Sequence, residues 1–207
     1  MRIVFPLYPG FTSLDVIGPY EVLSRLPEAE AVFAAVRPGP VTGEGGVTVT
    51  ATHALADLTE ADIIVVPGGP GTREAVSDAA YVAWLKAIDA TTTWTTSVCG
   101  GSLLLGAAGL LTGLEATSHW TAADLLPVFG ATFTLQRVVF QGKVVTAAGV
   151  SSGIDMALAL FARIEGDDAA QTVQLHIEYD PQPPFDHGSP AKATPDQIQR
   201  VRKLVMG

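Results

Sequence analysis

Thr92–Val98 (TTWTTSV) runs without a break into Cys99–Leu111 (CGGSLLLGAAGLL), and this junction decides the fold. The first segment is β-branched and aromatic, which favours a strand. The second is small and apolar, which is typical of a buried helix. Cys99, the chain's only cysteine, lies where the strand becomes the helix. This arrangement predicts a nucleophile elbow with sulfur in place of oxygen.

The thiol of Cys99 is expected to face the first backbone N–H groups of the helix, whose partial positive charge favours thiolate over thiol. Gly100 and Gly101 leave the turn uncrowded, so that backbone donors can approach a reacting atom. A free cysteine is often simply buried. Here the strand–cysteine–glycine–glycine–helix context favours a reactive thiol over that structural role.

Strands and helices alternate outward from this junction. Asp62–Val66 is a continuous apolar run, as expected for a central parallel strand buried on both faces. The alternation predicts an α/β fold, a mostly parallel sheet with helices on both faces. Further strands are predicted at Arg2–Leu7, Ala31–Val36, Val47–Ala51, Ala116–Ser118 and Thr132–Leu135, with a hairpin over Arg137–Ala147. Helices are predicted near Pro19–Leu26, Glu74–Ile88, Ser152–Ile164, Ala169–Tyr179 and Pro195–Met206.

The 207 residues suit a single domain, 1–207, that ends in a Pro-rich arm over Asp180–Pro190 and a helix. A formal net charge of −9 argues against a nucleic-acid partner, which needs a basic surface. No apolar run has the length of a membrane span, and Met1–Tyr8 is typical of a strand rather than a signal peptide. One cysteine forms no internal disulfide, which favours a cytoplasmic location.

Ligands of such sheets bind beyond the carboxyl ends of the strands. We therefore expect Tyr8–Asp15, Pro67–Gly71 and Cys99 to meet in one crevice. There the backbone N–H groups of Gly69 and Gly100 could stabilise an anion that develops beside the sulfur. The alternative for Gly68-Gly69 is a plain turn after a central strand.

Two carboxyl groups could donate and accept a proton next to the thiol. Thr12 followed by Asp15 resembles a capping box, which offers Asp15 a structural role. Gly18-Pro19 predicts a helix that begins at Pro19, with Glu21 in its first turn. The residues alone do not choose between Asp15 and Glu21.

The histidines His53, His119, His176 and His187 share no metal-ligand spacing, so no metal site is predicted. His119 could be an accessory base in a Cys–His pair, although hydrogen bonding within the core is the favoured role. Gly68–Gly71 lacks the lysine of a phosphate-binding loop and does not match a dinucleotide motif. No cofactor is predicted.

Four segments together resemble the ThiJ/PfpI superfamily, which has a glutamine-amidotransferase-like, flavodoxin-like α/β fold. They are Leu14–Leu23 (LDVIGPYEVL), Val66–Gly69 (VPGG), Ser97–Cys99 (SVC) and His119-Trp120. Within the superfamily the chain is most similar to the isonitrile hydratase family, over essentially its whole length. Gln174–Pro190 is the most discriminating part of that resemblance.

The resemblance implies a homodimeric, cofactor-free lyase that adds water to an isocyanide and gives an N-substituted formamide. It implies Cys99 as nucleophile, Asp15 rather than Glu21 as general acid and base, and Gly69 and Gly100 as backbone donors. Isonitrile hydratases typically carry threonine where this chain has Gly100. Either another group replaces that hydroxyl or the substrate differs. The alternatives are a glyoxalase-like thiol enzyme and a non-catalytic redox-sensing or ligand-binding protein.

Overall fold

The computed structural model describes residues 1–206, and its centre is a seven-stranded sheet. The strands lie in the order β10-β11-β7-β6-β1-β2-β5, and only the β10–β11 pair is antiparallel. Their bounds are β1 Arg2–Pro6, β2 Glu30–Ala35, β5 His53–Ala54, β6 Ile63–Val66, β7 Trp94–Val98, β10 Val138–Gln141 and β11 Val144–Ala147. The predicted α/β class is confirmed.

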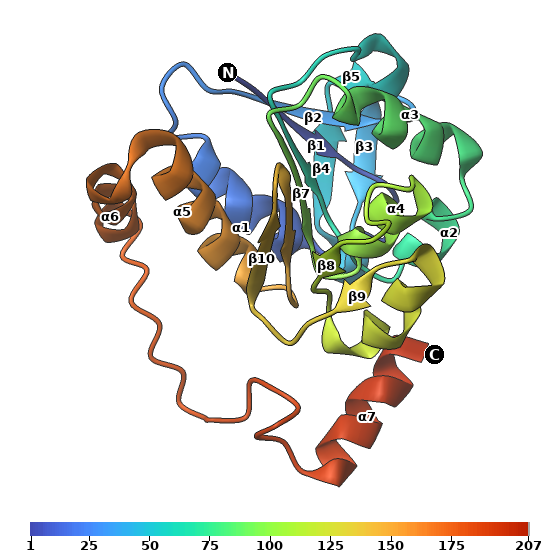
Figure 1. The fold of residues 1–207 in the computed structure, drawn as a ribbon, viewed down its shortest axis with the longest axis vertical. Helices are drawn as coiled ribbons and strands as arrows, with labels where there is room; N and C mark the ends of the chain where they lie inside the picture. Colours follow the sequence, from blue (N-terminus) through green and yellow to red (C-terminus); the bar gives the residue numbers. More distant parts are fainter. Residues whose placement is uncertain (207) are drawn as a thin grey trace.

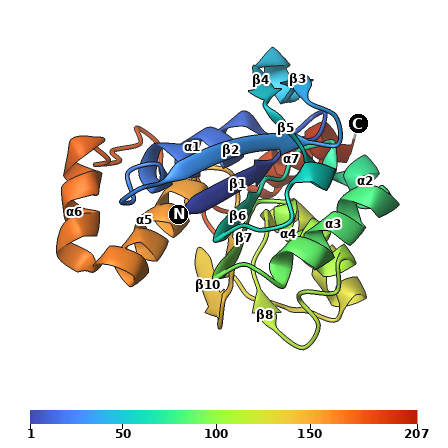
Figure 2. The ribbon, with the colours of Figure 1, turned by 90° about the horizontal axis from the view of Figure 1, so that it is seen from above.

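Helices cover both faces of the sheet (Figures 1 and 2). One face carries α1 (Ser13–Leu23), α5 (Ser152–Glu165) and α6 (Asp167–His176); the other carries α2 (Thr72–Ala75), α3 (Ala79–Asp89) and α4 (Gly101–Ala107). Within residues 1–206 no helix is both long and apolar enough to span a membrane.

Smaller elements surround the sheet. Two-stranded pairs form between β3 (Gly39–Thr42) and β4 (Thr48–Ala51), and between β8 (Glu115–Ala116) and β9 (Thr132–Phe133). Short 3₁₀ helices lie at η1 (Glu44–Gly46), η2 (Leu55–Asp57) and η3 (Trp120–Phe129). After α6 the chain runs away from the sheet as an extended arm and returns as α7 (Pro195–Met206), which packs beside η3 (Figure 1).

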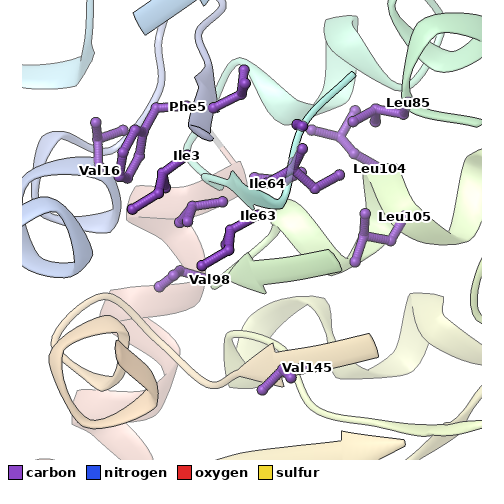
Figure 3. Close-up of a cluster of buried hydrophobic side chains, with 14 of the residues drawn as sticks. Ile3, Phe5, Val16, Ile63, Ile64, Leu85, Val98, Leu104, Leu105 and Val145 are labelled. Atoms are coloured by element: carbon purple, nitrogen blue, oxygen red, sulfur yellow. The ribbon is translucent and has the colours of Figure 1, made fainter. Parts of the chain in front are cut away.

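The core lies between the sheet and its helices. All four residues of β6 are fully buried, as the continuous apolar run predicted. Phe5 of β1, Val98 of β7 and Leu104 of α4 pack around this strand (Figure 3). Burying these side chains on both faces of β6 and β1 fixes two of the three strands whose carboxyl ends carry the candidate site.

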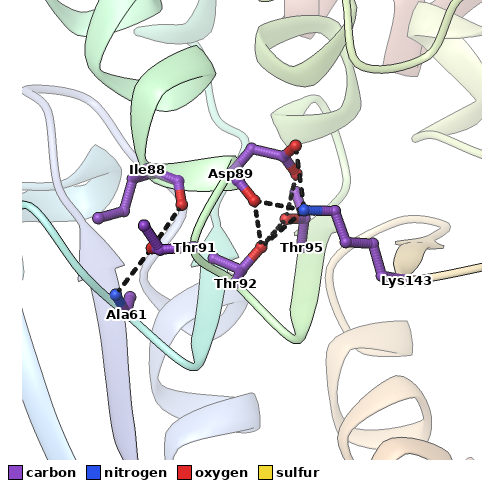
Figure 4. A network of polar contacts seen from close by, with 7 residues as sticks. All are labelled: Ala61, Ile88, Asp89, Thr91, Thr92, Thr95 and Lys143. Atoms are coloured by element: carbon purple, nitrogen blue, oxygen red, sulfur yellow. Dashed lines mark hydrogen bonds and ion pairs between the residues drawn. The ribbon is translucent and has the colours of Figure 1, made fainter.

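A polar network holds the opposite end of β7 (Figure 4). Thr95 is fully buried, and its hydroxyl donates to the Asp89 carboxylate at 2.6 Å. Lys143, just before β11, forms an ion pair with the same carboxylate at 3.1 Å. The network ties α3, β7 and β11 together, and so fixes the strand that ends at Cys99.

Three helix predictions need correction. The first helix begins at Ser13 rather than Pro19, and Pro19 lies inside it. The segment predicted as one helix, Glu74–Ile88, is two helices, because the Asp78 side chain accepts from two N–H groups and caps a new one. The helix after Cys99 ends at Ala107, since Gly109 turns to a φ of +78°.

Candidate active site

Three loops meet at the carboxyl ends of β1, β6 and β7. They are so close that a Cβ atom on Gly68 would lie 2.3 Å from the backbone nitrogen of Gly100. A Cβ on Gly71 would lie 1.9 Å from the carbonyl oxygen of Pro9. Only glycine allows this approach. The three segments expected to meet, Tyr8–Asp15, Pro67–Gly71 and Cys99, are therefore brought together by these loops.

The backbone of Cys99, at the elbow, adopts the left-handed conformation with a φ of +58°. Its N–H donates to the carbonyl oxygens of Ala147 (3.1 Å) and Ala148 (2.8 Å). Its carbonyl oxygen accepts from the hydroxyls of Ser118 (2.9 Å) and Ser102 (3.2 Å). These bonds hold a backbone conformation that a residue with a side chain rarely adopts, as is common at functional sites.

Asp15 lies in the first turn of α1 and is fully buried. Its Oδ2 atom accepts from the N–H of Gly68 at 2.8 Å, whereas Oδ1 has no hydrogen-bond partner within residues 1–206. Burial raises the pKa of Asp15 to about 7; the Gly68 N–H and the neighbouring Cys99 thiol lower it, and the charge of Glu44 raises it. Asp15 therefore exchanges its proton near neutral pH.

Burial also raises the pKa of the Cys99 thiol well above its usual value, and the charge of Asp15 adds to this. The N–H groups of Gly100 and Val150 lower it. The Gly100 N–H at the helix terminus favours the thiolate as expected, but desolvation outweighs the backbone donors in the resting protein, so the thiol keeps its proton. The thiol needs a base, and Asp15 is the carboxyl beside it.

The predicted backbone donors, Gly69 and Gly100, belong to loops that pack closely at this junction. Gly100 directs its N–H at the Cys99 sulfur. Gly69 is held in place through the preceding residue, because the carbonyl oxygen of Gly68 accepts from the Thr12 N–H at 2.8 Å. The Gly69 N–H itself makes no hydrogen bond to any described residue. Val150, in the turn after β11, is a donor that sequence reasoning missed.

Glu21 is paired elsewhere, and His119 packs against the Gly149–Val150 loop without a hydrogen bond to Cys99 or Asp15 within residues 1–206. The side chain of Glu21 is 52% exposed and pairs at 3.3 Å with Arg25, which lies just beyond the C-terminal end of α1. The Nδ1 atom of His119 bonds to the hydroxyl of Thr121 at 2.7 Å, and burial lowers the pKa of this imidazole. In the described part of the chain, no hydrogen bond joins His119 to Cys99.

The capping-box interpretation of Thr12 and Asp15 is also wrong. Asp15 accepts from Gly68 instead of reaching back to Thr12, and the hydroxyl of Thr12 donates to the carboxylate of Glu44. Glu44 is thereby held near Asp15, and its own N–H donates to the carbonyl oxygen of Phe11 at 2.8 Å. Sequence reasoning missed Glu44 because a glutamate among glycines resembles a surface turn.

Thr72 was missed as a site residue, and Tyr8 was expected only as the first residue of a segment at the site, without a role of its own. Both side chains are buried, and their oxygens lie 2.9 Å apart. The Thr72 hydroxyl occupies the space beside Gly100, 3.3 Å from the position a Cβ would take there. The site therefore has a hydroxyl next to residue 100, although it comes from α2 rather than from residue 100 itself. No group of three His, Cys, Asp or Glu side chains in residues 1–206 is arranged to hold a metal ion.

The buried cysteine at a strand-to-helix elbow, beside a buried carboxyl on a mostly parallel sheet, is typical of an α/β protein with a cysteine-based site. Residues 1–163 match the model of the DJ-1/PfpI family, and the chain belongs to that family. It is 42% identical to the isonitrile hydratase of Pseudomonas putida, over 98% of this chain and 89% of that protein. The predicted resemblance to the ThiJ/PfpI superfamily and to its isonitrile hydratases is confirmed.

Two solved structures show the same fold. A ThiJ/PfpI family protein from Pseudomonas syringae superposes with a TM-score of 0.95 at 38% identity, covering 99% of this chain and 86% of that one. Oxidized DJ-1 from Toxoplasma gondii superposes with a TM-score of 0.77 at 26% identity, covering 87% of this chain and 99% of its own.

Proposed function

We propose that this protein is a lyase that adds water to an isocyanide, R–N≡C, and releases an N-substituted formamide. One observation carries the proposal: the buried Cys99 thiol lies beside a buried carboxyl whose pKa is about 7. The terminal carbon of an isocyanide accepts both a proton and a nucleophile, so a thiol and a carboxyl group are complementary to it. The identity to the Pseudomonas putida isonitrile hydratase supports the same reaction.

In the first step the Asp15 carboxylate accepts the proton of the Cys99 thiol. It then passes this proton to the isocyanide carbon while the thiolate sulfur forms a bond to the same carbon. The product is a thioimidate, R–N=CH–S–Cys99, and Asp15 is again a carboxylate. The proton of the Cys99 thiol is the only one that this step needs, because Asp15 transfers it from the sulfur to the isocyanide carbon.

In the second step Asp15 accepts a proton from water as the oxygen attacks the thioimidate carbon. That proton is delivered to nitrogen, the C–S bond breaks, and R–NH–CHO leaves. The Cys99 thiolate recovers the second proton of the water through Asp15. The N–H groups of Gly69 and Gly100 stabilise negative charge that develops beside the sulfur. Water is consumed, and neither an oxidant nor a reductant is needed.

The test is the appearance of the formamide by NMR when the protein is incubated with an alkyl or aryl isocyanide. Cys99→Ala is expected to be inactive, and Asp15→Asn to lose at least about 10²-fold in rate, because it can neither accept nor deliver the proton. Glu21→Gln is the matched control, since this carboxyl belongs to the same helix but is exposed and paired with Arg25. Formamide production at the full rate by Cys99→Ala would rule out the covalent route.

The rival substrate is a small dicarbonyl such as methylglyoxal. The specific observation in its favour is Gly100, which brings no side chain of its own to the site. Loss of methylglyoxal in the same assay, without hydration of any isocyanide, would favour a glyoxalase-like reaction by the same thiol.

We also propose that the protein acts as a homodimer. Large apolar side chains are exposed far from the core, at Val128 (76%), Leu135 (86%) and Phe185 (78%). Phe185 belongs to the arm between α6 and α7, which Figure 1 shows extending away from the sheet. The resemblance to the isonitrile hydratase family implies a homodimer, and Phe185 gives the arm an exposed apolar side chain with which to contact a second copy. Sedimentation of a monomer at micromolar concentration would contradict the proposal.

A further inference from the structure

Tyr8, at the exit of β1, and Thr72, the first residue of α2, form a chain of hydroxyl groups behind the site. The Tyr8 hydroxyl donates to the carbonyl oxygen of Pro67 at 2.6 Å and lies 2.9 Å from the Thr72 hydroxyl. A carbonyl oxygen can only accept, so the single proton of Tyr8 belongs to Pro67. Thr72 therefore donates to Tyr8. Both side chains are only 5% exposed, so water does not substitute for either bond.

The carbonyl of Pro67 and the N–H of Gly68 belong to one peptide group. Its oxygen accepts from Tyr8, and its N–H donates to Oδ2 of Asp15 at 2.8 Å. The peptide is therefore held at both ends, between a tyrosine hydroxyl and the candidate catalytic carboxyl. A hydrogen bond to the oxygen of a peptide polarises it and strengthens its N–H as a donor.

We propose that Tyr8 and Thr72 are positioning residues, whose hydroxyls orient and polarise the Pro67–Gly68 peptide so that it holds Asp15 beside Cys99. Neither side chain touches the substrate in this scheme. The inference rests on the proposed function, because it concerns the carboxyl group that moves the proton. It adds a second layer to the site, drawn from β1 and α2, that supports the Asp15 carboxyl.

The groups that act on Asp15 come from several elements. Glu44 of η1 and Cys99 of the elbow both affect its pKa, and Asp15 in turn acts on Tyr8. Burial raises the pKa of Tyr8 well above its usual value, so its hydroxyl keeps its proton across the range in which Asp15 titrates. The α5 helix, which packs along α1, turns its acidic Asp155 towards Arg137 and Tyr179. His119, the N-cap residue of η3, is not among the groups that shift the pKa of Asp15.

The test is a ¹³C NMR titration of the Asp15 carboxyl carbon, assigned by its absence in Asp15→Asn, in the full chain without substrate. Tyr8→Phe removes the hydroxyl and weakens the Gly68 N–H as a donor to the charged carboxylate. The midpoint of Asp15 should then rise by about 0.3 to 0.7 of a pH unit. The acid limb of the hydration pH profile should move upward by the same amount.

Tyr81→Phe is the matched control. Tyr81 is equally buried, and its hydroxyl also donates to a prolyl carbonyl, that of Pro6, at 3.0 Å. It lies edge-on to Tyr8, with ring centroids 5.7 Å apart, but has no bond to the Pro67–Gly68 peptide. Its loss should leave the midpoint of Asp15 unchanged. Equal midpoints in Tyr8→Phe and Tyr81→Phe would overturn the proposal.

Thr72 supplies the second test, which decides the matter if Tyr8→Phe does not fold. Thr72→Val should raise the midpoint in the same direction, and Thr72→Ser should restore it. A midpoint that is the same in both Thr72 variants would overturn the proposal. The titration needs no isocyanide, so a protein that shows these midpoints without hydrating isocyanides refutes only the proposed function. A protein that hydrates isocyanides with unmoved midpoints refutes only the role of Tyr8 and Thr72.

Discussion

Replacing Asp15 with asparagine should make the protein more stable, and increasingly so as the pH rises. The pKa of this carboxyl is about 7 in the folded protein, compared with 3.8 for a free side chain. The folded state therefore holds the proton more tightly than the unfolded state. Asp15 costs no stability below about pH 4, and the cost grows until about pH 7, because ionisation is then easier in the unfolded chain.

The magnitude follows from these two values. One unit of pKa corresponds to about 1.4 kcal/mol, so the full cost of ionised Asp15 above pH 7 is about 4 kcal/mol. Asparagine has a similar shape, keeps an oxygen for the Gly68 N–H and carries no charge at any pH. Its advantage over the wild type should grow by about 2.5 kcal/mol between about pH 5 and about pH 8. Any difference in packing between aspartic acid and asparagine would add the same amount to the free energy of unfolding at every pH, so it would not change this increase.

Urea unfolding of both proteins, followed by circular dichroism at a series of pH values, measures this difference. Asp89→Asn is the contrasting control, since this carboxylate is paired with Lys143 and accepts from Thr95. Its removal should lower stability rather than raise it. A difference between wild type and Asp15→Asn that stays the same from about pH 5 to about pH 8 would refute the reasoning on the buried carboxyl.

Three further predictions concern the packing of the elbow and of α4. Cys99→Gly should be about 1 kcal/mol more stable than Cys99→Ala in thermal unfolding, because φ is +58° there and only glycine adopts it freely; equal stabilities would contradict a strained elbow. Gly68→Ala should cost several kcal/mol, on the order of 3, since its Cβ would lie 2.3 Å from the nitrogen of Gly100; wild-type stability in urea would show that the loops are further apart. Gly106→Ala should cost about 1–3 kcal/mol, because its Cβ would lie 2.7 Å from the ring of Phe129; an unchanged melting temperature would contradict this contact.

Much of the fold could be predicted because local patterns and tertiary contacts agree. The run Ile63–Val66 is apolar on both sides of the strand, and the strand is buried on both faces. The junction at Cys99 predicted a strand, a turn and a helix, and β7 and α4 follow this order. The start of α1 could not be predicted in this way. Gly18 packs against Ile154 and Gly153 packs against Pro19, and this contact between helices distant in sequence keeps a proline inside a helix.

The candidate site could be predicted only where the residue type and its neighbours in the sequence indicate the role. Cys99 stands out as a lone thiol between a strand and glycines, whereas Asp15 and Glu21 could be separated only by resemblance. Burial separates them physically, and burial is a property of the whole fold. The high pKa of the thiol and the hydroxyls behind the Pro67–Gly68 peptide depend on the same long-range packing, so no local pattern signals them.

The pH dependence of formamide release from an isocyanide tests the central claim most directly. If the Asp15 carboxylate takes the proton of the Cys99 thiol, the rate should rise with pH through an inflection near 7, the pKa of Asp15. Asp15→Asn should be slow at every pH and lack this inflection. A wild-type rate that does not change across neutral pH, or the same inflection in Asp15→Asn, would contradict the account.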